Sequence, residues 1–65
     1  MTNNEIREIR KEIDRLSIMK DFLYEEKIKA LRAKDRTRYE KLSDDYDDYS
    51  FRIHRLRRML KTNNA

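Results

Sequence analysis

The stretch YEKLSDDYDDYSFRIHRLRRML, residues 39–60, decides the fold. Its apolar and aromatic side chains recur at alternating steps of three and four residues: Tyr39, Leu42, Tyr46, Tyr49, Ile53, Leu56 and Leu60. This is the a/d spacing of a helix that packs along one stripe against another helix. A disordered chain of the same composition has no reason to keep this step. The stretch therefore predicts a long amphipathic helix, which we place at residues 37–61.

The first half of the chain carries a matching stripe. Its members are Ile6, Ile9, Ile13, Leu16, Lys20, Leu23, Lys27 and Ala30, so two lysines replace apolar residues near its end. A Thr2-x-x-Glu5 capping box precedes the stripe. These features predict a first helix at residues 3–32.

The two stripes match each other when the second helix runs antiparallel to the first. Ile6 with Leu60 and Ile13 with Ile53 both add to 66, while Ile9 with Leu56, Leu16 with Tyr49 and Leu23 with Leu42 add to 65. A constant sum lets both stripes face each other along their whole length if the chain folds back in a turn at residues 33–36. Asp35 is one candidate N-cap of the second helix, and a Thr37-x-x-Glu40 capping box is the other. The alternative is one uninterrupted helix, because neither glycine nor proline marks the turn.

Length and composition limit what this fold can be. The chain has 65 residues, 46% of them charged, and contains no Cys, Gly, Pro or Trp. No apolar run approaches the roughly 20 residues of a membrane span, and the start of the chain lacks the apolar core of a signal peptide. Below roughly 70–80 residues a single core rarely holds a fold without help. We therefore expect an all-α, cytoplasmic protein: a single domain over residues 1–65, an antiparallel two-helix hairpin that dimerises into a four-helix bundle.

Some apolar side chains lie outside both stripes. We predict a protein interface from those near the middle of the hairpin, expected as one patch: Ile18, Met19, Phe22 and Phe51. The expected partners are a second copy of the chain and a larger protein. In outline the dimer resembles the plasmid repressor-of-primer proteins, which are helical hairpins that dimerise and bind RNA, although no residue motif is shared.

Charge is divided into zones along the hairpin. Residues 27–41 at the loop end carry a net +5, the middle (13–26 and 42–50) a net −6, and the open end (1–12 and 51–65) a net +5. The open end supplies candidate phosphate-binding side chains: Arg7, Arg10, Lys11, Arg52, Arg55, Arg58 and Lys61. Binding of RNA or DNA through the basic ends is therefore the alternative function.

The acidic cluster at residues 44–48 fills positions between the seam residues, so we interpret it as a solvated helix face. Ser43 and Asp47 resemble two of the five positions in the Ser-Gln-Glu-Leu-Asp signature of sporulation aspartyl-phosphate phosphatases. His54 has no partner at catalytic or metal-binding spacing. We expect no catalytic residue, no cofactor and no metal. The predicted function is a non-enzymatic interaction module, a regulator, inhibitor or assembly factor of the kind that phages, plasmids and bacteria often encode.

Overall fold

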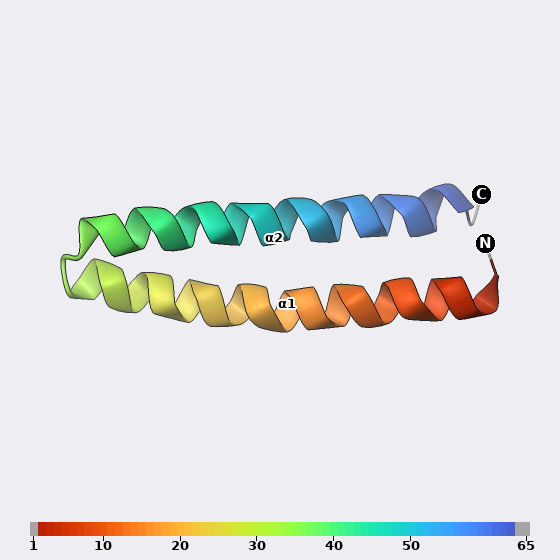
Figure 1. Cartoon of the computed structure of the whole chain (residues 1–65), viewed down its shortest axis with the longest axis horizontal. Helices are drawn as coiled ribbons and strands as arrows, with labels where there is room; N and C mark the ends of the chain where they lie inside the picture. The colour runs from red at the N-terminus through yellow and green to blue at the C-terminus, as the bar shows by residue number, and fades with distance from the viewer. Residues whose placement is uncertain (1, 64–65) are drawn as a thin grey trace.

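The computed structural model describes residues 2–63 and shows two long helices packed side by side (Figure 1). Helix α1 runs over Asn3–Arg32 and helix α2 over Arg36–Asn63, compared with the expected 3–32 and 37–61. The helices are antiparallel, so both ends of the chain lie at the same end of a body measuring 47 × 15 × 12 Å. The predicted helical hairpin is confirmed, and the single continuous helix is excluded. Within the described residues, neither helix is long and apolar enough to cross a membrane.

Helix α1 starts at the predicted cap. Thr2 has an extended backbone, and its side-chain Oγ1 accepts a hydrogen bond of 3.2 Å from the Glu5 N–H. The Thr2 hydroxyl in turn donates to the Glu5 carboxylate at 3.2 Å. One of the free N–H groups of the first turn is thereby satisfied, and the acidic side chain lies at the positive end of the helix dipole.

The turn is tight and contains a left-handed lysine. Lys34 has φ 56, a conformation that glycine usually supplies. The Lys34 N–H donates to the Leu31 carbonyl at 3.1 Å, and the Asp35 N–H donates to the Ala30 carbonyl at 2.9 Å. These two bonds form a Schellman motif, which ends α1 and reverses the chain at once.

Asp35 then starts the second helix. Its carboxylate Oδ1 accepts from the Arg38 N–H at 3.2 Å, and its carbonyl accepts the first helical bond from Tyr39. The expectation of a Thr37 cap is therefore wrong, because Thr37 already lies inside α2. One residue closes the turn and caps the next helix, which leaves only three residues between α1 and α2.

The predicted stripes form the seam between the helices, and all of their members are buried or half-buried. The described hydrophobic residues that are buried are Leu16, Leu23, Ala30 and Ile53. Near the open end the seam is aliphatic, whereas towards the loop Lys20 and Lys27 face tyrosines. The core is therefore small and only partly apolar.

The pairing register follows the predicted sums. The Lys20 ammonium lies 5.1 Å from the centre of the Tyr46 ring, and the Lys27 ammonium lies 5.3 Å from the centre of the Tyr39 ring. Both pairs add to 66. The register expected from the apolar residues thus extends through the part of the seam where lysines replace them.

Candidate interaction surfaces

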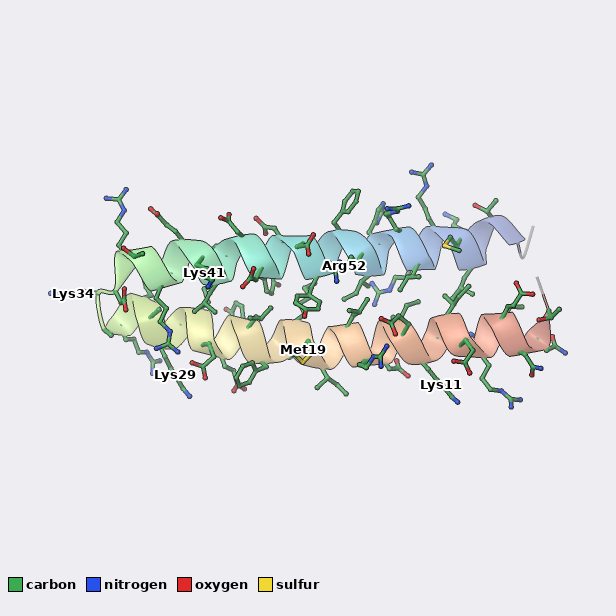
Figure 2. The ribbon with its side chains drawn as sticks, viewed as in Figure 1. Lys11, Met19, Lys29, Lys34, Lys41 and Arg52 are labelled. Carbon is green, nitrogen blue, oxygen red and sulfur yellow. The ribbon has the colours of Figure 1, made fainter. Side chains whose placement is uncertain are left out.

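The predicted interface residues of α1 are exposed. Ile18 keeps 69% of its surface accessible, Phe22 54% and Met19 40%. Ile18 and Phe22 are one helical turn apart. Met19 follows Ile18 in the sequence, and Figure 2 shows it on the side of α1 that faces the viewer. We call these three residues the α1 patch. None of them occupies a seam position, so the contact between α1 and α2 does not account for them.

Phe51 does not join the α1 patch. It is 61% exposed and occupies the outermost helical position of α2, pointing away from α1. Ile18 occupies the corresponding outermost position of α1, seven residues from Lys11, which Figure 2 shows on the outer edge. Side chains that point away from a common seam lie on opposite edges of a two-helix body. The expectation of one continuous patch on a single hairpin is therefore not met, although both apolar surfaces exist.

The two flat faces of the hairpin differ, and Figure 2 shows one of them. Its seam-flanking residues, the ion-pair face, are Glu5, Glu12, Met19, Glu26, Arg38, Asp45, Arg52 and Met59. The Arg38 guanidinium donates to the Glu26 carboxylate at 2.9 Å, which joins the two helices. Glu12 and Arg52 line one shallow pocket from opposite helices. On the ion-pair face Glu26 and Arg38 thus pair across the seam, whereas Glu12 pairs with Arg15 and Arg52 with Asp48, each within its own helix.

The opposite face has few charges beside the seam. Its seam-flanking residues, the serine face, are Arg10, Ser17, Tyr24, Leu31, Arg36, Ser43, Ser50 and Arg57. The three serines are half-buried, whereas Tyr24 and Leu31 are 52% and 56% exposed. The Ser43 hydroxyl oxygen is buried and finds no hydrogen-bond partner among the described residues. Between its basic ends, the serine face is uncharged along the seam and lined by small side chains.

Lysines and tyrosines form a cluster in the loop half of the seam. The Lys27 ammonium lies between two rings, 5.3 Å from the centre of Tyr39 and 5.2 Å from that of Tyr46. Tyr24 and Tyr46 contact each other at 6.2 Å between ring centres. From the sequence, Lys20 and Lys27 are expected only as replacements for apolar residues in the stripe. The missed signal was present, because the antiparallel sum places both lysines opposite tyrosines.

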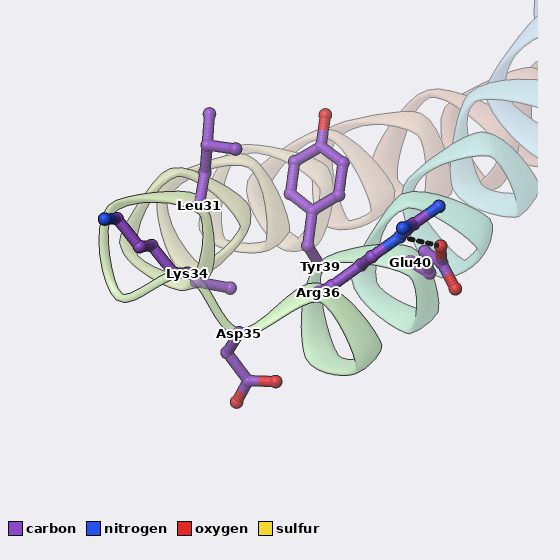
Figure 3. A pocket seen from close by; sticks show the side chains of 7 residues that line it. Leu31, Lys34, Asp35, Arg36, Tyr39 and Glu40 are labelled. Carbon is purple, nitrogen blue, oxygen red and sulfur yellow. Dashed lines mark hydrogen bonds and ion pairs between the residues drawn. The ribbon is translucent and has the colours of Figure 1, made fainter.

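A shallow pocket of about 530 Å³ lies at the loop end of the serine face (Figure 3). Leu31 and Tyr39 stand on the same side of the turn and form its apolar part. Arg36 and Glu40 close one side through a 3.1 Å ion pair, drawn dashed in Figure 3. This arrangement suits an apolar side chain flanked by a charge, rather than a buried small molecule.

The candidate phosphate-binding residues are all exposed, but they do not converge on one face. By helical position Arg10 lies on the serine face and Arg52 on the ion-pair face, while Lys11 and Arg58 point outward. Some are already engaged, since Arg52 pairs with Asp48 at 3.1 Å. Arg55 and Arg58 are brought together, and they line one shallow pocket with Met59 and Thr62.

The exposed α2 residues considered for catalysis do not line a described pocket that could serve as an active site. Asp47 and His54 are exposed on α2, and neither lines any of the pockets described above. No group of three or more His, Cys, Asp or Glu side chains able to hold a metal ion occurs in the described part of the chain.

No protein-family model matches the chain, and no curated protein or solved structure shows significant similarity to it.

Proposed function

We propose that this protein is a non-enzymatic interaction module that pairs with a second copy of itself and presents the α1 patch to a larger protein. The observation that carries the proposal is the exposure of the α1 patch, in which Ile18, Met19 and Phe22 keep 69%, 40% and 54% of their surface accessible. Large apolar side chains clustered on a small surface are typical of protein interaction sites.

The small core supports the same proposal. Leu16, Leu23, Ala30 and Ile53 are the buried hydrophobic residues that the structure describes. A chain of 65 residues without disulfides needs further burial for stability, and a partner helix surface supplies it. Association with another chain would therefore add stability and would also cover the exposed apolar side chains.

The α1 patch can be tested with matched variants. We expect Ile18→Ser combined with Phe22→Ser to abolish co-purification of a host partner, while circular dichroism shows unchanged helix content. Lys11→Ser is the control, because residue 11 occupies the same helical position as Ile18 one heptad earlier. Equal recovery of partners by the double variant and the control would contradict the assignment.

Nucleic-acid binding is the second candidate, favoured by the pairing of Arg55 and Arg58 beside one depression. The acidic middle of the hairpin would repel a phosphate backbone laid along the whole length, so contact would be limited to the basic ends. Phosphate contacts are strongest at low salt. Arg55→Ala with Arg58→Ala should then lower affinity for duplex DNA or structured RNA at low ionic strength. Absence of any binding by the unaltered protein under those conditions excludes this candidate.

A further inference from the structure

The polar side chains that border the serine face are distributed unevenly along the hairpin. On α2, Glu40 and Asp47 lie on the loop side of Ser50, whereas His54 and Lys61 lie on the open side. These four residues occupy one helical position at seven-residue steps, next to the serine face. In the sequence, the two acidic residues therefore precede Ser50 by nearly the same numbers of residues by which His54 and Lys61 follow it.

Helix α1 shows the same polarity. Arg7 and Arg10 lie at the open end of the serine face, Asp14 lies near its midpoint, and Asp21 lies towards the loop. Along this side of the hairpin the open end is thus basic and the middle is acidic, while at the loop end Arg36 of the serine face is paired with Glu40 at 3.1 Å. On the ion-pair face, by contrast, the Glu26–Arg38 ion pair already joins the two helices of one hairpin across the seam.

Two copies of a surface with this charge distribution are complementary when one copy is turned end to end. When two copies meet face to face and antiparallel about a two-fold axis near Ser50, Glu40 of one comes opposite Lys61 of the other. Asp47 likewise comes opposite His54 and close to Arg57. A parallel arrangement would instead place the basic open end of one copy on the basic open end of the other. Closed two-fold dimers require this kind of self-complementary patch.

We propose that the serine face is the self-association surface and that a second copy of this chain occupies it, antiparallel, to complete a four-helix bundle. Ser17, Ser43 and Ser50 are small enough for the backbones of the two hairpins to approach closely, as helices packed at about 8–10 Å require. Tyr24 and Leu31, more than half exposed in one hairpin, are covered in the pair. The buried Ser43 hydroxyl comes opposite Arg57 of the second copy.

This inference rests on the self-association proposed above and assigns it to one face. The α1 patch is then left free, since Phe22 and Met19 lie on the ion-pair side and Ile18 lies on the outer edge. The dimer would therefore present two copies of the α1 patch, at symmetric positions, to a larger protein.

Cross-linking of single-cysteine variants tests the face. The chain has no cysteine, so Ser50→Cys adds the sole thiol. Two copies of residue 50 near the axis can meet the short Cα separation that a disulfide requires. We expect the variant to form a disulfide-linked dimer under mild oxidation at least about tenfold faster than Asp48→Cys, whose thiol lies on the other side of α2, next to the ion-pair face.

The result separates the two proposals. Preferential cross-linking of Asp48→Cys, in a protein that sediments as a dimer, would overturn the serine face while leaving self-association intact. A protein that stays monomeric at every concentration tested would overturn both.

A charge exchange tests the antiparallel register. Glu40→Lys alone should weaken dimerisation about tenfold in sedimentation, because the two-fold axis repeats each lost pair. Adding Lys61→Glu to the same chain should restore affinity, since the opposed charges are again opposite in sign. The contact between Glu40 and Arg36 inside the hairpin is lost in both variants, so it cannot cause the restoration. Failure of the second change to restore dimerisation contradicts the register.

Discussion

Lys27 lies between two aromatic rings in a seam that helices normally fill with aliphatic side chains. Its ammonium is about equally distant from the centres of Tyr39 and Tyr46, and its side chain is half-buried. A cation over a ring face is attracted by the ring quadrupole while the alkyl stem covers the seam. The lysine thus stabilises the loop half of the hairpin without adding purely apolar surface.

This account of Lys27 predicts an energetic coupling between it and Tyr39. A double-mutant cycle of Lys27→Met and Tyr39→Leu, measured by urea unfolding, should show a coupling of about 0.5–1 kcal/mol. Both substitutions keep the seam apolar, so the cycle isolates the interaction between cation and ring. If the losses of stability from the two single substitutions simply add, Lys27 and Tyr39 lie close together without stabilising each other.

Lys34 is the other residue whose conformation has a measurable cost. A non-glycine residue in the left-handed region is strained by roughly 1 kcal/mol. Lys34→Gly should therefore raise the free energy of unfolding by about 0.5–1 kcal/mol. Lys34→Ala, which keeps a Cβ, serves as the control and should give no such gain. A destabilising glycine would mean that the lysine side chain itself holds the turn.

At the scale of the elements, the helices and their register were predictable because they depend on side-chain spacing. The sums that paired Ile13 with Ile53 also placed Lys20 opposite Tyr46, where the structure has it. The turn was harder to predict, because Lys34 occupies the left-handed position at which a glycine usually marks the end of a helix. The placement of Ile18 and Phe51 on opposite edges follows from their helical positions. It could be deduced only after α1 and α2 were known to pack along these stripes.

The seam predicts a sharp contrast between neighbouring positions of α2. Ile53 is 4% exposed and Phe51 is 61% exposed. Ile53→Asp buries a charge without a partner and should cost about 3 kcal/mol or more, enough to unfold so small a protein. Phe51→Asp, two residues away, should leave the helix signal in circular dichroism nearly unchanged. Comparable loss of helix in both variants would refute the division into seam and outer surface.

At the scale of the whole molecule, the fold leaves more apolar surface than one hairpin can bury. The two flat faces differ in how their charges are satisfied. On the ion-pair face Glu26 and Arg38 pair across the seam, whereas for the serine face we propose that it is complementary to a second copy turned end to end. The sequence showed spare apolar residues, but the assignment of a face to each partner required knowing which residues flank the seam.

The most direct measurement is the distance between spin labels on Thr37→Cys, an exposed residue at the loop end, in the otherwise cysteine-free protein. In the antiparallel dimer the two labels lie near opposite ends, and the helical rise places them roughly 40 Å apart. We predict a single distance distribution near that value. Labels within about 20 Å would reveal a parallel dimer, given the same rise per residue. Absence of any dipolar coupling would show a monomer and contradict the proposed assembly.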